Sequence, residues 1–391
     1  MKAMRVLSIF GTRPEAIKMA PVVRVLEQTP GIESLVCVTA QHRQMLDQVL
    51  NLFRIIPDYD LNLMRPDQSL AQLTAAVFEG LDPVLAETQP HWVLVQGDTT
   101  TVMAATLAAY YRRIRVGHVE AGLRTGDKWQ PFPEEINRRV ASVTADLHFA
   151  PTQQSRQNLL NEGIPDANIS VTGNTVIDAL QAVARLPVNA GFLDYLASLG
   201  IPEPFRRPAT DRVQPPGPRL VLVTAHRREN FGQPLEDICA ALRCLAESYG
   251  PEEIHLIYPV HLNPNVQEPV RRLLGEVPNI TLLPPLDYFP MVHLLKQTTL
   301  LLTDSGGLQE EAPGLGVPVL VMRRVTERPE GVEAGTVRLV GTDTETILRE
   351  SRRLLDDVEA HRAMAQAVNP YGDGKAAGRI VRAILNHSTD I

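Results

Sequence analysis

Long apolar runs, cysteine and excess positive charge are scarce in this sequence, and each shortage excludes a class of protein. No uninterrupted apolar run reaches the roughly 18 residues that a membrane span requires, so an integral membrane protein is not expected. Charge and proline enter the first stretch, "MKAMRVLSIFGTRPEA", too early for a signal peptide, and a cytoplasmic location is expected. The net charge of -7 gives no general attraction to nucleic acid or anionic lipid.

Cysteine use also limits the chemistry that the chain can carry. The three cysteines are Cys37, Cys239 and Cys244, and their neighbours are largely apolar. This small, odd number fits reduced, buried thiols better than a disulfide framework or a zinc site. The fingerprint Gly-x-Gly-x-x-Gly is absent as well, which weakens an interpretation as a nicotinamide or flavin enzyme. We therefore expect no metal and no cofactor.

Short β-branched runs alternate with helical patterns along most of the chain, which is typical of βαβ units with parallel sheets. In the first half, "RVLSIF" precedes a helical pattern from about Pro14, and "HWVLVQ" precedes "TTVMAATLAAYYRR". Residues 201–218 hold six prolines, which neither a helix nor a central strand tolerates, so we expect a linker there. After this stretch the alternation begins again with "RLVLVT".

The predicted fold class is therefore α/β, with two successive doubly wound, Rossmann-like domains. We expect the first domain to span residues 1–187 and to be completed by a C-terminal helix within residues 370–391 that packs back on it. The second domain is expected at residues 188–369. Open parallel sheets bind ligands beyond the carboxyl ends of their strands, so the residues that follow each strand are expected to line a central cleft.

The segment after the first predicted strand combines a helix start with two cations, Arg13 and Lys18. Pro14 suits the first helical position and leaves backbone amides pointing at the cleft, where the two cations could strengthen an anion site. The plainer interpretation is a capped helix with surface charges.

Carboxylates follow two further strands of the first half. Asp98 comes after "WVLVQ" and serves either as the N-cap of the next helix or as a proton-transfer group. Glu120 comes after "VGHV", where it is a poor cap and its burial requires a partner or a ligand. Glu134 and Glu135 lie at a predicted helix start, where acidic residues are routine, but they follow Glu120 closely enough to reach the same cleft.

The second half offers groups for an anion at the ends of two predicted strands. The sequence His226-Arg227-Arg228 follows "LVLVT" and is a candidate diphosphate clamp, although a lone histidine is more often structural.

The stretch "TDSGGLQEEAPGLG" places Ser305, Gly306 and Gly307 at a predicted helix N-terminus, where a hydroxyl and backbone amides can contact a diphosphate. Glu310 or Glu311, further along this helix, could bind neutral hydroxyls such as those of a ribose. The ligand that these groups suggest is a nucleoside diphosphate with a further group attached.

These stretches closely resemble the motifs of the non-hydrolysing UDP-N-acetylglucosamine 2-epimerases, a family with the two-domain architecture of GT-B glycosyltransferases. The matching stretches include "FGTRPEAIKMAP", "QGDTTT", "GHVEAGLRTGD", "PFPEEINRR", "HRREN", "LLTDSGGLQEEAPGLGVPVLVM" and "TERPEGVEAGTVRLVG". They cover almost the whole chain apart from the proline-rich stretch, and so many long motifs in order make the resemblance specific.

The resemblance implies reversible epimerisation of UDP-N-acetylglucosamine to UDP-N-acetylmannosamine at C2, without a cofactor. In this family the reaction is understood as elimination of UDP to a 2-acetamidoglucal, followed by re-addition. Such a reaction needs several carboxylates, because positive charge develops at the anomeric carbon and a proton must leave one face and return to the other. The resemblance also implies a homodimer, and a product that supplies N-acetylmannosamine units for surface polysaccharides.

Roles for individual residues follow from the resemblance alone. The implied catalytic residues are Asp98, Glu120, Glu134 and His226. The implied substrate-binding residues are Arg13, Lys18, Asp98, Glu120, His226, Ser305, Gly306, Gly307, Glu311 and Arg328, so the family selects Glu311 over Glu310. Gln41 and Gln44 match an allosteric site for a second substrate molecule, whereas Asp67 stands where a basic residue is expected and speaks against such activation.

Three alternative functions remain at this stage. A GT-B glycosyltransferase would use the same kind of donor but needs an acceptor. A hydrolysing epimerase would release free N-acetylmannosamine and UDP. A non-catalytic nucleotide-sugar sensor would bind without turnover, which the joint presence of Asp98, Glu120 and Glu134 makes improbable.

Overall fold

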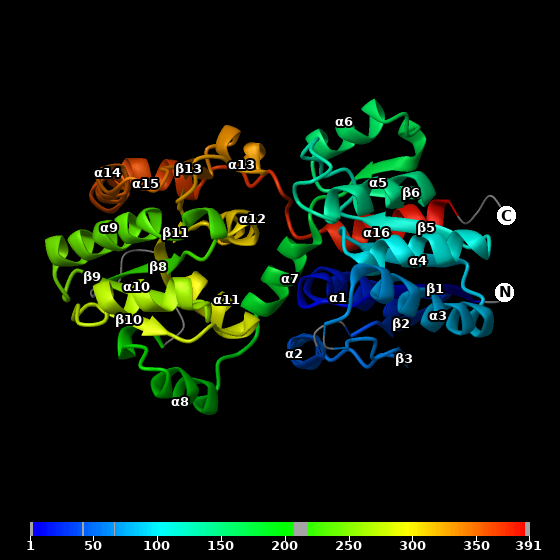
Figure 1. Ribbon diagram of the computed structural model, residues 1–391, viewed down its shortest axis with the longest axis horizontal. Coiled ribbons are helices and arrows are strands. Elements are labelled where there is room, and N and C mark those ends of the chain that lie inside the picture. Colours follow the sequence, from blue (N-terminus) through cyan, green and yellow to red (C-terminus); the bar gives the residue numbers. More distant parts are fainter. Residues whose placement is uncertain (1–2, 41–42, 66, 207–217, 388–391) are drawn as a thin grey trace. The chain divides into compact units, whose positions relative to one another are not determined.

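The computed structural model describes residues 3–40, 43–65, 67–206 and 218–387, and it contains two compact units (Figure 1). Unit 1 consists of Met1–Ala179 and Tyr371–Ile391, and unit 2 consists of Leu180–Pro370. These units are defined by contacts within the chain and not by independent folding. The domain limits predicted from the sequence, 1–187 and 188–369, therefore stay a prediction.

Within the described residues, unit 1 holds a seven-stranded parallel sheet with the order β3-β2-β1-β4-β5-β6-β7. Its strands are β1 (Met4–Phe10), β2 (Ile32–Val38), β3 (Tyr59–Asp60), β4 (Trp92–Gln96), β5 (Arg115–Val119), β6 (Leu147–Ala150) and β7 (Ile169–Val171). The order reverses between β1 and β4, which makes the carboxyl ends of these two strands the place where a doubly wound sheet binds its ligand.

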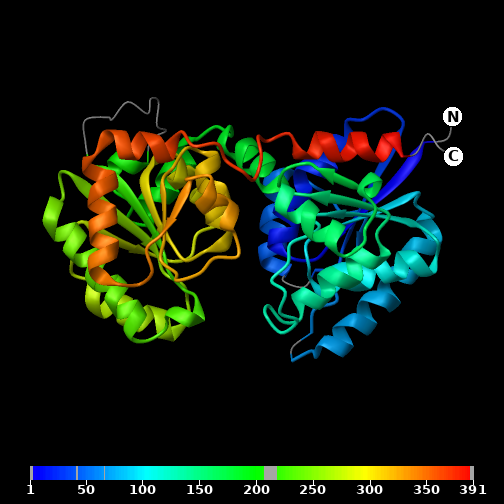
Figure 2. The ribbon, with the colours of Figure 1, turned by 90° about the horizontal axis from the view of Figure 1, so that it is seen from above.

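Helices cover both faces of this sheet (Figure 2). The helices of unit 1 are α1 (Arg13–Glu27), α2 (Arg43–Phe53), α3 (Leu70–Thr88), α4 (Thr100–Tyr111), α5 (Glu134–Thr144), α6 (Gln153–Asn161) and α16 (Ala376–Asn386), with the short 3-10 helix η1 (Asp166–Asn168). Helix α7 (Thr175–Ala184) carries the chain from unit 1 into unit 2. Helix α16 packs against α1, so the prediction of a C-terminal helix that returns to the first domain is confirmed.

The central strands of unit 1 form a sheet because their side chains are apolar on both faces, as buried parallel strands require. In β4 every residue is buried, and in β1 the last five residues are buried. Leu7 and Ile9 point into the core beneath α3 and α4, together with Val93 and Val95. The alternate residues of β1 therefore face the side that α1 covers.

Unit 2 repeats this architecture with a six-stranded parallel sheet, in the described part of the chain, of order β10-β9-β8-β11-β12-β13. Its strands are β8 (Arg219–Thr224), β9 (Ile254–Pro259), β10 (Ile280–Leu283), β11 (Thr298–Thr303), β12 (Val319–Val321) and β13 (Val337–Leu339). The order reverses between β8 and β11. The predicted fold class, two doubly wound α/β folds, is confirmed.

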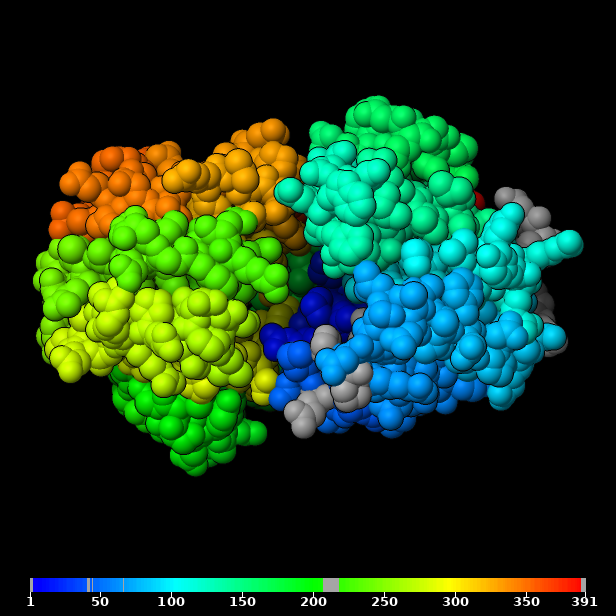
Figure 3. Space-filling view, viewed as in Figure 1, coloured from blue at the N-terminus to red at the C-terminus, as the bar shows by residue number. Residues whose placement is uncertain are grey.

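Helices again cover both faces of the sheet. The helices are α8 (Ala190–Ser198), α9 (Gln233–Tyr249), α10 (Pro264–Leu274), α11 (Tyr288–Gln297), α12 (Gly306–Gly314), α13 (Pro329–Glu333), α14 (Thr344–Asp356) and α15 (Val358–Ala365), with 3-10 helices η2 (Glu203–Phe205) and η3 (Arg228–Asn230). Helices α9 and α10 form much of the near surface of this unit in the space-filling view (Figure 3).

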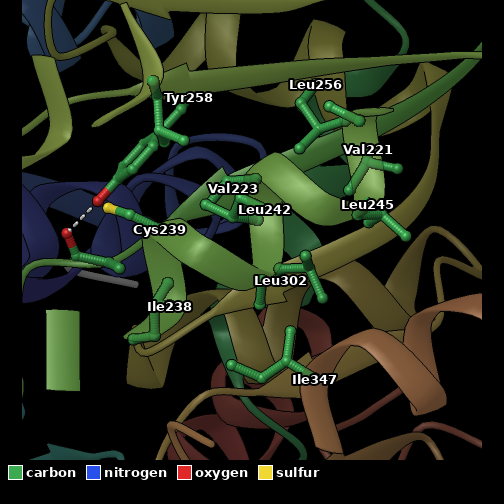
Figure 4. Close-up of a cluster of buried hydrophobic side chains, with 14 of the residues drawn as sticks. Val221, Val223, Ile238, Cys239, Leu242, Leu245, Leu256, Tyr258, Leu302 and Ile347 are labelled. Carbon is green, nitrogen blue, oxygen red and sulfur yellow. Dashed lines mark hydrogen bonds between the residues drawn. The ribbon is translucent and has the colours of Figure 1, made fainter. Parts of the chain in front are cut away.

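One core of unit 2 lies between the sheet and helices α9, α10 and α14 (Figure 4). There Val221 and Leu256 of the sheet meet Leu242 of α9. The hydroxyl of buried Tyr258 donates a hydrogen bond of 2.7 Å to the carbonyl of Ala225, which fixes the chain just before His226.

The linker expected at residues 201–218 is wrong in its first part. Ile201 and Phe205 are buried with Leu196 in the second core of unit 2, so this stretch belongs to that unit despite its prolines. Pro202 and Pro204 are tolerated because they precede or begin the short 3-10 helix η2, in which the amide of Phe205 donates a hydrogen bond of 3.0 Å to the carbonyl of Pro202. Burial of the apolar side chains then holds the segment on unit 2. Residues 207–217 lie outside the described residues. Among the described helices, none combines the length and apolarity needed to cross a membrane.

Candidate active site

Each sheet has a switch point, the place where its strand order reverses, between β1 and β4 in unit 1 and between β8 and β11 in unit 2. Most of the candidate residues from the sequence lie at or near these two places. In unit 1, Gly11 follows β1 and Gly97 follows β4. In unit 2, Ala225 follows β8 and Asp304 follows β11.

The start of α1 is fixed by a buried carboxylate that the sequence analysis missed. Thr12 is the N-cap and forms a capping box with Glu15, whose Oε2 accepts from the amides of Gly11 and Thr12 at 2.9 and 2.7 Å. Oε1 of Glu15 accepts from the hydroxyl of Thr99 at 2.6 Å, so the same side chain ties the turn after β1 to the turn after β4. Burial raises the pKa of Glu15 above its usual value.

The two predicted cations of this helix have different surroundings. Arg13 is the first residue of α1, one position earlier than the Pro14 start expected from sequence, and it has no hydrogen-bond or ion-pair partner among the described residues. Lys18, one turn later, places its Nζ 2.5 Å from Oε2 of Glu120. The resemblance implies that Lys18 binds substrate, whereas in the structure it pairs with the candidate catalytic carboxylate.

Glu120 occupies the tip of β5 in a constrained and buried state. Its φ of 63° lies in the left-handed region, which costs energy for a residue with a side chain, and it is 8% exposed. Besides Lys18, Gln96 at the end of the neighbouring strand donates a hydrogen bond to Oε2. The carboxylate is thus oriented by two side chains from β4 and α1, and Gln96 could have been noticed as a polar residue ending an apolar strand.

Asp98 is held by an arginine and not by a helix start. Thr99 is the N-cap of α4, so the N-cap interpretation of Asp98 is wrong. Oδ2 of Asp98 lies 2.6 Å from Nη2 and 2.9 Å from Nε of Arg138, so two nitrogens of one guanidinium hold this oxygen in place. Asn137 donates to the backbone carbonyl of Asp98 at 2.9 Å.

The adjacent glutamates at the start of α5 differ in their hydrogen-bond partners. Glu135 is fully buried and accepts from the amides of Thr125 and Gly126 at 3.1 and 3.3 Å and from Arg138 at 3.2 Å. These donors lower the pKa of Glu135 despite its burial. Glu134 instead has a buried Oε2 with no hydrogen-bond partner in the described part of the chain. An oxygen of this kind is available for a ligand proton.

A buried histidine supports the turn that carries Asp98. His118 of β5 is 1% exposed, and its Nε2 lies 2.7 Å from the carbonyl oxygen of Gly97. Its register partner on β6, His148, is equally buried. Burial lowers the pKa of His118 to about 4 and that of His148 to about 3, so both rings are neutral near pH 7.

In unit 2, His226 is fixed at the tip of β8 by Asp304 at the tip of β11. The amides of His226 and Arg227 donate to Oδ2 of Asp304 at 2.7 and 2.8 Å. Nδ1 of His226 lies 3.4 Å from Oδ1 of the same carboxylate. Desolvation lowers the pKa of His226, while the charge of Asp304 opposes this shift. Asp304 was not among the residues predicted from the sequence, although it directly precedes the Ser-Gly-Gly turn.

The Ser-Gly-Gly turn forms the N-terminus of α12 as predicted. Ser305 is the N-cap residue, but its side chain makes no capping hydrogen bond to the helix. A Cβ on Gly306 would lie 2.6 Å from Nη1 of Arg328, so glycine leaves room for this guanidinium at the helix N-terminus. The positive end of the helix and Arg328 therefore lie together, which is the electrostatic character of an anion site.

Glu310 and Glu311 are distinguished by their surroundings. Glu310 is 2% exposed and forms an ion pair with Arg328, so it orients that cation. Glu311 is partly exposed, and its Oε1 would lie 3.5 Å from a Cβ placed on Gly307. Glu311 therefore lies against the glycine turn.

A buried arginine connects the loop that follows β8 with the loop that carries Arg328. Arg323 is 4% exposed and bonds Glu229 of η3 at 2.6 Å and Glu327 at 2.9 Å. The hydrogen bonds from Arg323 lower the pKa of Glu327 to about 2. This pairing links the loop after His226 to the loop that carries Arg328.

The allosteric role of Gln41 and Gln44 stays a prediction. Gln41 lies outside the described residues, and for Gln44 the structure describes only its place in α2. Asp67 has a φ of 54°, in the left-handed region.

By class, this is a pair of Rossmann-like units, each with polar groups at its switch point, and in unit 2 a helix N-terminus lies beside Arg328. A fold of this class is shared with the glycotransferase of kitacinnamycin, at a TM-score of 0.61 and 11% identity, with 99% of each chain covered. That likeness concerns the fold alone.

The family is identified by closer comparisons. The family model described as UDP-N-acetylglucosamine 2-epimerase matches residues 24–385. The UDP-N-acetylglucosamine 2-epimerase of Escherichia coli K12 is 56% identical over 384 residues, with 98% of this chain and 99% of the relative covered. That of Salmonella typhimurium is 55% identical over 388 residues, covering 99% and 100%. The chain belongs to the UDP-N-acetylglucosamine 2-epimerase family.

Solved structures agree with this assignment. The crystal structure of the Neisseria meningitidis UDP-GlcNAc 2-epimerase bound to UDP-GlcNAc is 48% identical, with a TM-score of 0.83 and coverage of 98% of this chain and 100% of that one.

Proposed function

We propose that the chain interconverts UDP-N-acetylglucosamine and UDP-N-acetylmannosamine by inverting C2. The relatives at 55 and 56% identity carry this activity in their names, and the Neisseria meningitidis structure has UDP-GlcNAc bound. The observation that supports the proposal most directly is Glu120, which is buried, strained in backbone and paired with Lys18. Strain and buried charge of this kind are retained at sites of chemistry.

The proposed mechanism is elimination of UDP to a 2-acetamidoglucal, followed by re-addition. As the anomeric C–O bond lengthens, positive charge develops on the sugar, and the carboxylates of unit 1 stabilise it. One carboxylate removes the C2 proton, and another group returns a proton to the opposite face. Asp98, Glu120 and Glu134 are the candidates. Arg138 orients Asp98, Lys18 and Gln96 orient Glu120, and Glu134 has a buried oxygen without a partner among the described residues.

Unit 2 holds the nucleotide in this proposal. The amides at the N-terminus of α12, together with Arg328 and His226, bind the diphosphate, and Glu311 binds the ribose. Arg13 adds a further cation for the diphosphate, which fits its lack of a partner among the described residues. We further propose a homodimer and a product that feeds surface polysaccharide synthesis.

The test is incubation of the protein with UDP-N-acetylglucosamine alone in heavy water. Epimerisation predicts deuterium at C2 of both recovered UDP-sugars, because the proton leaves to solvent and returns from it. Absence of exchange together with transfer to an added acceptor would establish a GT-B glycosyltransferase. Free N-acetylmannosamine plus UDP would indicate a hydrolysing enzyme, and saturable binding without any turnover would indicate a sensor.

A further inference from the structure

Asp304 is a buried carboxylate whose two oxygens have different partners. It is fully buried at the end of β11. Oδ2 accepts from the amides of His226 and Arg227, and from Nδ2 of Asn230 at 3.1 Å. This oxygen therefore fastens the loop after β8, which is a structural role.

The other oxygen is left for the histidine ring. Oδ1 of Asp304 is buried and accepts no hydrogen bond within the described residues, while Nδ1 of His226 lies 3.4 Å away. A buried, unpartnered carboxylate oxygen is costly, and a proton on Nδ1 is the group that can compensate it. Only 37% of the His226 side chain is exposed, so water satisfies this buried side of the ring poorly.

A second histidine restricts the plane of the ring. His261 stacks on His226 with 5.4 Å between ring centroids and an interplanar angle of 9°. Nδ1 of His261 accepts from the amide of Asn263 at 3.1 Å, so the proton of the neutral His261 ring is on Nε2. The stacking leaves His226 little freedom to turn Nδ1 away from Asp304.

We propose that Asp304 is a positioning residue that holds His226 with its proton on Nδ1 and thereby reserves Nε2 for an oxygen of the diphosphate. When the ligand binds, Nε2 takes one proton from solvent, and the resulting imidazolium has an N–H directed at an anion on each side. Those anions are Asp304 at Nδ1 and the diphosphate at Nε2. The assignment of the ligand rests on the proposed function, whereas the tautomer does not.

The charges around His226 set the direction of its response to ligand. Burial, His261 and Arg227 lower its pKa, and Asp304 raises it. The free ring is therefore mostly neutral near pH 7, and a bound diphosphate adds the negative charge that favours protonation. UDP affinity should consequently weaken as pH rises from 6 to 8, with uptake of a proton on binding.

The tautomer is tested on the unmodified protein by NMR of ¹⁵N-labelled histidine without UDP, at a pH where His226 is neutral. The signals of His226 are assigned by their loss in His226→Asn. The expected result is a protonated Nδ1 and an unprotonated Nε2. The opposite tautomer, or an even mixture, overturns the proposal, and neither result depends on whether the protein binds or turns over a sugar nucleotide.

Asp304→Asn tests the consequence for binding. An amide can keep its oxygen on the loop amides and offer its N–H₂ to Nδ1, which moves the ring proton to Nε2. We expect UDP affinity at pH 6 to fall about tenfold or more, and its pH dependence to flatten, since a lost bond to a charged group is worth roughly this factor. An unchanged pH profile with the native fold retained would overturn the proposal.

Asn230→Ala is the matched control, because it removes a donor to Oδ2 and leaves Oδ1 untouched. If Asp304 merely fastens the loop, both variants weaken UDP binding equally at every pH. If it positions His226, only Asp304→Asn shifts the tautomer. A protein that binds UDP with this tautomer but exchanges no C2 proton would contradict the proposed function alone.

Discussion

At the scale of single residues, two adjacent glutamates illustrate how one sequence pattern divides into structure and chemistry. Glu135 is enclosed by two backbone amides and Arg138, whereas Oε2 of Glu134 is buried without a partner in the described chain. The sequence allows either residue of the pair to serve catalysis. Only the direction of each side chain, which α5 fixes, separates them.

Glutamine substitutions at these two positions form a matched pair. Glu134→Gln should lower kcat roughly 10² to 10⁴-fold, the scale of a lost acid-base group, and leave the unfolding midpoint unchanged. Glu135→Gln should reduce stability by about 1–3 kcal/mol, because buried donors lose their acceptor. Kinetics and urea denaturation of both variants provide the comparison. Should the two exchange effects, Glu135 would be the catalytic residue.

Glu120→Gln should retain UDP binding, because the nucleotide groups lie in unit 2, and lose roughly 10² to 10⁴ in kcat. Deuterium incorporation at C2 should fall in parallel with turnover. Glu79→Gln, an exposed position on α3, is the control and should behave as the unmodified protein. Turnover that survives in Glu120→Gln would remove this residue from the mechanism.

At the scale of elements, the alternation of strands and helices in both units could be predicted because apolar strand runs and helical periodicity are local signals. The short strands β3, β6, β7 and β13 gave no such signal. The same signals located the residues at strand tips, since parallel strands end on one edge of the sheet. Partners could not be predicted in this way. Gln96, Arg138 and Asp304 are distant in sequence from the side chains they orient, and only packing brings them together.

The proline-rich stretch shows a second limit of sequence reasoning. Six prolines exclude a long helix or a central strand at residues 201–218 but do not decide whether the chain there is a linker or a covering segment. Phe205 decides it, because its ring is buried in unit 2.

Two buried histidines on the neighbouring strands β5 and β6 lead us to expect that the protein loses stability in acid. His118 and His148 have folded-state pKa values of about 4 and about 3, lowered from 6.5 by burial. Between these values and 6.5 the unfolded chain binds more protons than the native one, so the free energy of unfolding falls as pH drops through this range. For His118 alone the loss approaches about 3 kcal/mol near pH 4.

Tryptophan fluorescence can follow this effect, because both tryptophans, Trp92 and Trp129, lie in unit 1. Urea denaturation from pH 7 to pH 5 should show a falling midpoint for the unmodified protein and a smaller slope for His148→Phe. His91→Gln, at an exposed position, is the control and should keep the full slope. Equal slopes in the unmodified protein and His148→Phe would show that His148 does not carry the effect.

At the scale of the whole molecule, the two units place different polar side chains on one architecture. The switch point of unit 1 carries carboxylates with oriented partners, whereas that of unit 2 carries a helix N-terminus, Arg328 and His226. Parallel α/β folds allow this because the loops after their strands can change while the apolar sheet stays the same. Under the proposed function, the chain therefore separates proton transfer from nucleotide binding along its sequence.

This separation predicts where UDP protects the backbone from hydrogen exchange. At a concentration about 100 times its Kd, UDP should stabilise the protein by about 2.7 kcal/mol and slow exchange at the start of α12 and in the loop after β8. Arg328→Gln should abolish most of this protection, since its guanidinium lies at the helix N-terminus beside Gly306. Arg338→Gln, which breaks only a surface ion pair with Glu350 in the same unit, should retain it. Amides exchange more slowly where a ligand orders the chain. Protection confined to unit 1 would therefore mean that unit 1, which bears the carboxylates, binds the nucleotide.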